Sequence, residues 1–231
     1  MFNDIVNKVV NYDDDVFRNI PTIYKSENLL DDLSSDPENM SRAENLMSET
    51  ALEDLSSIIN RPFQDGPALG NVRQATRYSD GTRFGVWYGS VSPSTTVYET
   101  VYHWQRRLSV TKFDAKTQKE IVTYRRLFKV SVLGLIIDIL GKEIKYPALV
   151  DKKDYSLTNT LGSYLYAQGA NGIVFRSARD TEGINIGAFK PTILSHVRPD
   201  SHMRYRWTPG SDVVTVEKTP GRLWKRTQSF F

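Results

Sequence analysis

Apolar residues between positions 35 and 59 recur at the spacing of a single helix face. They are Met40, Ala43, Leu46, Met47, Leu52, Leu55, Ile58 and Ile59. Ser35 or Asp36 can cap the first turn, and Glu38 can complete a capping box. Pro37 suits the first helical position because it has no amide proton to leave unpaired. The pattern predicts a helix that ends near Ile59 and packs its apolar face on the rest of the protein.

The first 34 residues show a weaker pattern. Acidic runs at residues 13–15 and 31–32 stand among scattered apolar residues, which indicates one or two short helices and loops. Together with the helix that follows, they predict an acidic helical N-terminal extension over residues 1–60.

From Arg61 onward the chain is divided into short segments by glycine and proline, and we expect the main domain to cover residues 61–231. Residues 86–91 read as a strand, and a helix is expected from Ser94 or Thr95 through Trp104. Further strands are expected at residues 108–113, 121–124, 127–140 and 173–177, a helix at 156–167, and a hairpin of 203–207 with 213–217. This order predicts a mixed α/β (α+β) fold with mostly antiparallel strands.

Composition limits the classes of protein that need to be considered. The chain of 231 residues is 39% hydrophobic, which is enough for a sizeable core. The absence of cysteine excludes disulfides, thiolate nucleophiles and Cys-ligated zinc. The longest apolar run, residues 130–140, is too short to cross a bilayer, and the N-terminus has no signal-peptide pattern. We therefore expect a soluble cytoplasmic protein with no membrane association.

Charge is distributed unevenly along the chain. Residues 1–60 contain 13 acidic and 4 basic side chains, whereas residues 61–231 contain 14 acidic and 26 basic ones. Three interpretations follow: the acidic part docks on the basic part, the basic part binds an anionic ligand such as a dinucleotide, or both are solvated faces.

Common sequence motifs for phosphate and metal binding are missing. There is no Walker A motif and no G-x-G-x-x-G that opens a helix, so neither a P-loop enzyme nor an ordinary Rossmann dehydrogenase is indicated. With three histidines and no cysteine, we expect no metal. Glu99 and His103 stand four residues apart on one predicted helix, where a hydrogen-bonded pair is favoured over a shared metal.

Two segments carry the candidate chemistry. Residues 77–90 place Arg77 before a glycine-containing turn and a strand that ends in Tyr88 and small residues, and the next helix carries Glu99. Further on, Ser156 opens a predicted helix, and Ser177 ends a predicted strand that Asn185 and Phe189 follow. In this order the segments resemble the RES-domain family, over about residues 61–195.

The residue types fit the cleavage of a dinucleotide such as NAD. An arginine offers paired donors to a pyrophosphate, a role for Arg77, with Arg61 or Arg83 as further candidates. A carboxylate can stabilise the positive charge that develops on the ribose when the nicotinamide bond breaks, a role for Glu99.

Three more residues could contribute to the same site. The ring of Tyr88 could stack on nicotinamide, and the hydroxyls of Ser156 and Ser177 could orient the ribose, the amide or an attacking oxyanion. Each residue also has a structural alternative: Tyr88 could belong to the core, Ser156 could cap a helix beside Asp154, and Ser177 could simply end a strand.

The resemblance implies an ADP-ribosyltransferase-like split antiparallel sheet around an NAD cleft. It also implies a toxin of a toxin–antitoxin pair that depletes NAD by phosphorolysis or hydrolysis, with NAD as substrate, inorganic phosphate as a possible acceptor and an Xre-like antitoxin as partner. One alternative keeps the site but transfers ADP-ribose to a protein. Another is a nucleic-acid-binding module, in which residues 204–207 and 222–226 alternate cations with aromatic rings. Under the toxin interpretation, contact with nucleic acid is expected only through the antitoxin.

Overall fold

The computed structural model describes residues 2–22, 55–64, 75–110, 120–218 and 223–228. The strands are β1 (Val9–Pro21), β2 (Trp87–Ser90), β3 (Ile121–Asp138), β4 (Gly172–Arg176), β5 (Ile184–Ala188), β6 (Leu194–Trp207), β7 (Val213–Lys218) and β8 (Leu223–Gln228). The helices are α3 (Leu55–Gln64), α4 (Pro93–Val110), α5 (Lys142–Lys145) and α6 (Ser156–Ala167), with single 3-10 turns η2 (Pro147–Val150) and η3 (Pro191–Ile193).

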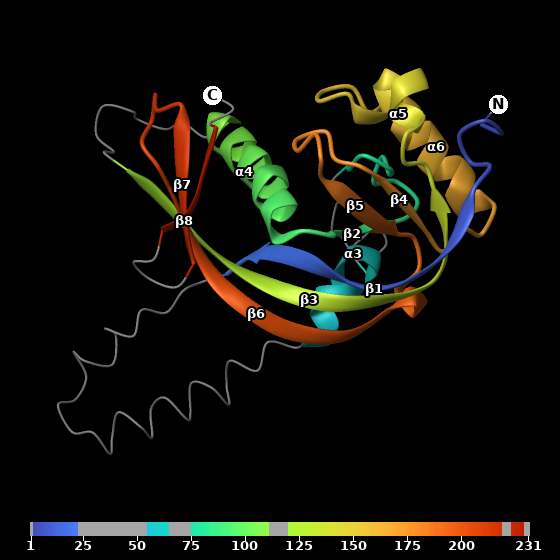
Figure 1. The fold of residues 1–231 in the computed structure, drawn as a ribbon, viewed down its shortest axis with the longest axis horizontal. Helices are drawn as coiled ribbons and strands as arrows, with labels where there is room; N and C mark the ends of the chain where they lie inside the picture. The colour runs from blue at the N-terminus through green and yellow to red at the C-terminus, as the bar shows by residue number, and fades with distance from the viewer. Residues whose placement is uncertain (1, 23–54, 65–74, 111–119, 219–222, 229–231) are drawn as a thin grey trace, which may run out of the picture.

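All eight strands belong to one sheet, in the order β1-β2-β5-β4-β3-β6-β7-β8. Strand β1 also pairs with β3, so the pairings of β1, β2, β5, β4 and β3 close into a ring. Within this sheet only the β3–β4 pair is parallel. Strands β6, β7 and β8 continue outward from β3 as an antiparallel extension (Figure 1). The mixed α/β fold with mostly antiparallel pairing is confirmed.

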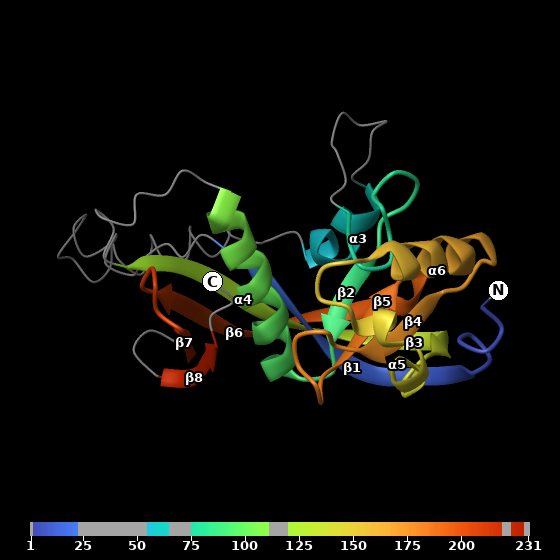
Figure 2. The ribbon, with the colours of Figure 1, turned by 90° about the horizontal axis from the view of Figure 1, so that it is seen from above.

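Three hydrophobic clusters hold the elements together. The first packs Val16, Trp87 and Phe128 against Ile58 of α3, between the long strands and the short ones. The second joins α6 to β4 and the segment before β2, and the third joins α4 to β6 and β7. Strands β2 and β5 therefore lie between α4 and α6, as Figures 1 and 2 both show.

Several predicted elements are confirmed. Helix α6 covers the predicted residues, and α4 buries Val97 and Val101 on its inner face while Trp104 packs beside them. Strands β2 and β4 and the β6–β7 hairpin also form where they were expected. The two strands expected at residues 121–124 and 127–140 are one continuous strand, β3. The strand expected from residue 108 is wrong for residues 108–110, which continue α4; residues 111–113 lie outside the described part. No helix in the described part of the chain is long and apolar enough to cross a membrane.

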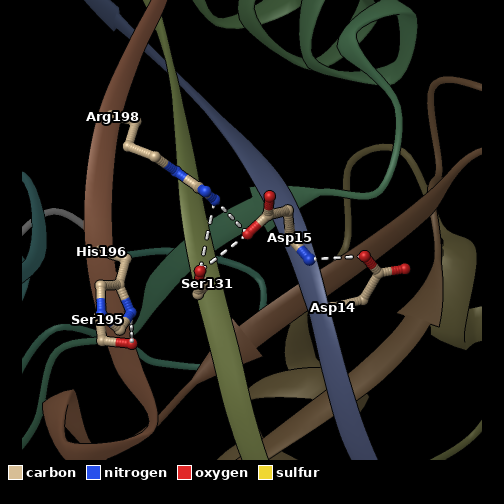
Figure 3. A network of polar contacts seen from close by, with 6 residues as sticks. All are labelled: Asp14, Asp15, Ser131, Ser195, His196 and Arg198. Carbon is tan, nitrogen blue, oxygen red and sulfur yellow. Dashed lines mark hydrogen bonds and ion pairs between the residues drawn. The ribbon is translucent and has the colours of Figure 1, made fainter.

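The predicted helical N-terminal extension is wrong for residues 9–21. Residues 9–21 form β1, which pairs with β3 at every position, because Val10, Tyr12, Val16 and Ile20 alternate toward one buried face. The acidic run concealed this alternation in the sequence. Figure 3 shows how one of its members is accommodated: Asp15 accepts hydrogen bonds from Ser131 of β3 and Arg198 of β6.

The predicted helix that ends near Ile59 lies outside the described residues up to position 54. Residues 55–59 are helical, but α3 continues to Gln64, past the boundary expected at residue 61. The helix continues because its next turn is also packed: Gly85 approaches the Pro62 carbonyl so closely that an added Cβ would lie 1.7 Å from its oxygen.

Replacement of Val16 tests the place of β1 in the core. We expect Val16→Ala to lower the free energy of unfolding by about 2 kcal/mol, because two buried methyl groups are lost and a cavity remains. The same change at Val9, which is 58% exposed on the same strand, should stay within about 0.5 kcal/mol of the wild type. Chemical denaturation measures both, and equal effects would contradict the position of β1.

Candidate active site

A hydrogen-bonded cluster around Glu99 joins α4 to the ends of three strands. The Oε1 atom of Glu99 accepts a hydrogen bond from the Ser177 hydroxyl at 2.6 Å and one from the Asn185 amide at 2.9 Å. Glu99 is half-buried, whereas Ser177 and Asn185 are buried. Two donors on one carboxylate oxygen fix the side chain in one orientation.

The cluster extends from Asn185 to Ser90. The buried Ser90 hydroxyl donates to the Asn185 side-chain oxygen at 2.6 Å, and the two residues face each other in the β2–β5 register. With its oxygen directed at Ser90, the Asn185 amide must direct its NH2 group at Glu99. The pairing of the two strands therefore sets the donor that the carboxylate receives.

Ser177 links the cluster to the turn that follows β4. Its hydroxyl accepts from the backbone amides of Arg179 at 3.0 Å and Asp180 at 3.1 Å, while its proton goes to Glu99. The Thr95 hydroxyl donates to the Asp180 carboxylate at 2.8 Å, which ties the turn to the first turn of α4. Ser177 thus ends a strand, organises a turn and contacts Glu99 at the same time.

Among the described residues, none donates a hydrogen bond to the second carboxylate oxygen of Glu99, Oε2. The same part of the chain shows no group of three histidine or acidic side chains that could hold a metal ion. The Glu99 carboxylate is therefore fixed by two donors on Oε1, whereas Oε2 receives no hydrogen bond from the described residues.

Tyr88 is held by its hydroxyl group. That group accepts from the backbone amide of Tyr78 and donates to the Thr76 hydroxyl, both at 3.0 Å. Burial raises the pKa of Tyr88 to about 12. The ring meets Phe175 edge to face, and Arg18 of β1 donates to the Tyr88 carbonyl at 2.6 Å. Tyr88 therefore fastens the segment that carries Arg77 to β2.

Arg77 is held both at its backbone carbonyl and at its guanidinium group. Its carbonyl, like that of Thr76, accepts from the Asn159 amide of α6, at 2.8 and 2.7 Å respectively. Its guanidinium donates to the carbonyls of Leu149 at 3.1 Å and Asp151 at 2.8 Å. The same group lies over the Tyr155 ring, 4.6 Å from the ring centre. Arg77 therefore stands at the loop that leads into α6.

The other predicted residues lie elsewhere. Arg61 is on α3, and the Ile58 carbonyl of this helix accepts a hydrogen bond from the Trp87 side chain. Trp87 and Tyr88 lie on opposite faces of β2, so α3 and Arg61 are on the face opposite to Tyr88. Arg83 is exposed in a turn, where hydrogen bonds from Thr82 lower the pKa of Asp80 and the charge of Arg83 adds a smaller effect. Of the three candidate arginines, Arg77 is the one that shares this face with Tyr88.

Ser156 is exposed at the start of α6, and its hydroxyl and amide both contact the Asp154 carboxylate. These bonds lower the pKa of Asp154. Residue Tyr155 occupies the N-cap, so Ser156 contributes to the helix start from the first helical position. The contacts described for Ser156 do not include Glu99.

Sequence reasoning missed two members of this region, Ser90 and Arg179. Ser90 lies two residues after Tyr88 and so on the same face of β2, a relation that strand alternation could have shown. Arg179 lies two residues after Ser177, but nothing in the sequence indicates that its side chain turns toward α4.

Comparisons with known proteins agree with the pattern of residues. A family model described as RES domain matches residues 50–208. No curated protein matches the chain. Among solved structures, the MbcT–MbcA toxin–antitoxin complex of M. tuberculosis is similar at 11% identity, with 83% of this chain and 86% of that chain covered and a TM-score of 0.47.

Substitution of Asn185 by aspartate tests the polarity of the cluster. Asn185→Asp places a second carboxylate against Glu99, so we expect the free energy of unfolding at pH 7 to fall by about 1–3 kcal/mol. The new carboxyl has a raised pKa in the folded protein, so the loss should be full above that pKa. It should shrink as the pH falls toward about 3.9, the ordinary value for aspartate.

Denaturation at several pH values measures this difference. Asn11→Asp, on the exposed face of β1, is the matched control and should show no comparable loss. A deficit for Asn185→Asp that grows as the pH falls from 7 to 4 would contradict the contact between Asn185 and Glu99.

Proposed function

This chain belongs to the RES domain family, and from the Glu99 cluster we propose that it is an enzyme that cleaves the nicotinamide–ribose bond of NAD. The observation that carries the proposal is the half-buried carboxylate of Glu99, held through Oε1 by Ser177 and Asn185 with Oε2 left for a substrate. A fixed carboxylate of this kind suits a reaction in which positive charge develops on a sugar.

In this proposal the Oε2 atom of Glu99 faces the ribose that bears nicotinamide. It accepts a hydrogen bond from a ribose hydroxyl and stabilises the oxocarbenium character that develops as the bond to nicotinamide breaks. Because the serine and asparagine donors already fix the carboxylate, it needs no reorganisation during the reaction. Ser177 acts through this orientation, since its single proton is given to Glu99.

Tyr88 and Arg77 would bind the two ends of the nicotinamide nucleotide. The hydroxyl of Tyr88 is occupied by the Thr76–Tyr78 segment, so its ring is the part that would contact nicotinamide. Arg77 keeps its charge at the loop before α6, where it would attract the pyrophosphate. Ser156 lies in the same loop region and would act at the edge of the site.

The acceptor of ADP-ribose is inorganic phosphate or water in the reaction that we propose, which makes the enzyme an NAD phosphorylase or glycohydrolase. An ADP-ribosyltransferase would use the same Glu99 and a protein side chain as acceptor. We further propose a cytoplasmic toxin of a toxin–antitoxin pair, restrained by an Xre-like antitoxin. Membership of the RES domain family supports this role.

The nucleic-acid alternative loses its main support in the structure. Arg204 and Arg206 both form ion pairs with the buried Glu217, at 2.6 and 3.0 Å, and Arg206 also pairs with Glu120 at 3.4 Å, so two carboxylates balance the two arginines. In the second basic segment, Lys225 lies over the Tyr98 ring. Residue 222 lies outside the described part of the chain.

Substitution of Glu99 tests the proposed function. We expect the wild type to release nicotinamide from NAD, and Glu99→Gln to reduce that rate by about a hundredfold or more, since the neutral amide cannot stabilise the developing charge. The glutamine oxygen can still accept from Ser177 and Asn185, so the melting temperature should change little. Glu182→Gln, at an exposed glutamate, is the matched control and should keep wild-type activity.

Chromatographic detection of nicotinamide, with and without phosphate, measures the reaction and distinguishes phosphorolysis from hydrolysis. Labelled NAD and gel analysis detect transfer to a protein. If the wild type releases no nicotinamide under any of these conditions, the proposed function is wrong. If Glu99→Gln retains wild-type activity, the role of Glu99 is wrong.

A further inference from the structure

The side chain of Arg179 is clamped against an aromatic ring beside the Glu99 cluster. Its guanidinium carbon lies 3.6 Å from the ring centre of Tyr102. Tyr102 follows Glu99 by three residues on α4, so the two share a helix face. Stacking on the ring restricts the orientation of the guanidinium, whose edge can still donate hydrogen bonds to an anion.

The guanidinium of Arg179 has unused hydrogen-bonding capacity. One terminal nitrogen, Nη2, donates to the Lys152 carbonyl and, at 3.3 Å, to the Tyr155 hydroxyl. The other, Nη1, is buried and has no hydrogen-bond partner among the described residues. In that part of the chain no carboxylate lies within ion-pair distance of Arg179. A buried cationic donor without an acceptor is costly, and a ligand that supplies the acceptor removes the cost.

A second arginine approaches the same tyrosine from another direction. Arg77 lies over the Tyr155 ring, whereas Arg179 reaches its hydroxyl. Both guanidinium groups also donate to carbonyls of one short segment, residues 149–152. Both charges contribute to lowering the pKa of Asp151, after its hydrogen bonds from the amides of Asp154 and Lys153. Two fixed cations therefore converge on the loop before α6.

We infer that Arg179 and Arg77 are the two arms of a subsite for a pyrophosphate group, with Tyr102 and Tyr155 as the rings that hold them. Its position suits the proposed function, on which this inference rests. Tyr102 lies about one helical turn, roughly 5.4 Å, from Glu99, and a single ribose separates the pyrophosphate of NAD from the bond to be cleaved. Phosphate oxygens would replace the Lys152 carbonyl at Nη2 and give Nη1 the acceptor that it lacks.

A purely structural role predicts something different. If Arg179 only fastened the residue 149–155 loop to α4, its loss would disturb every ligand of the site, charged or neutral. If it binds the pyrophosphate, its loss weakens ligands that carry the group and spares those that do not. Paired ligands that differ in the pyrophosphate alone therefore separate the two roles.

The test compares ADP with adenosine by titration calorimetry on the full chain at fixed salt. The wild type should bind ADP more tightly than adenosine. Arg179→Gln should weaken ADP about tenfold to a hundredfold, as expected for the loss of a charge-assisted contact, and leave adenosine unchanged. Arg107→Gln, an equal charge change at an exposed position on α4, should weaken ADP by less than about twofold at physiological salt.

A further variant guards against loss of folding. Arg179→Lys keeps the charge but not the planar fork, so it should weaken ADP severalfold without a change for adenosine. The inference is overturned if the wild type does not prefer ADP to adenosine, or if the folded variants lose both ligands equally or neither. Selective loss of ADP without any nicotinamide release by the wild type would support the subsite and refute the proposed reaction. Normal nicotinamide release with unchanged ADP binding by Arg179→Gln and Arg179→Lys would support the proposed reaction and refute the subsite.

Discussion

Strand β1 pairs with two strands at once, and the rest of the structure depends on this closure. Its pairing with β3 and β2 completes the ring of five strands around the first hydrophobic cluster. Two successive residues then extend to opposite faces: Arg18 donates to the Tyr88 carbonyl of β2, and Asn19 donates to Thr96 of α4. A single strand therefore fixes the two elements that carry Tyr88, Ser90 and Glu99.

The polar cluster on this framework is specific because the hydrogen bonds of each member set the orientation of the next. Ser90 sets the orientation of the Asn185 amide, and Asn185 and Ser177 together occupy one oxygen of Glu99. Two pairs of arginines are held differently. Arg204 and Arg206 form ion pairs with Glu217 and Glu120, whereas Arg77 and Arg179 rest on aromatic rings and carbonyl groups.

Local sequence was sufficient for the elements whose pattern and ends are marked in the chain. The apolar spacing of Val97 and Val101 predicted α4, and the glycines at positions 169 and 172 marked where β4 begins. The order of the segments that carry Arg77, Tyr88, Glu99, Ser156 and Ser177 along the chain indicated the family, which the RES domain model confirms. Residues 9–21 were misread because an acidic run interrupts their alternation, and their strand is stabilised mainly by β3, more than a hundred residues away.

Tertiary structure alone decided which of the candidate residues meet. Ser177 and Asn185 reach Glu99 because β4 and β5 pair beside β2, whereas the side chain of Ser156 turns to Asp154 and Arg61 lies on the other face of the sheet. Spacing along the chain fixes the face of an element on which a side chain lies. The sequence therefore determined the elements with a clear apolar pattern and the chemical groups that they carry. Pairing across the sheet fixes the partners, which is why the orientation of Arg179 and the hydrogen bonds to Glu99 emerge only from the fold.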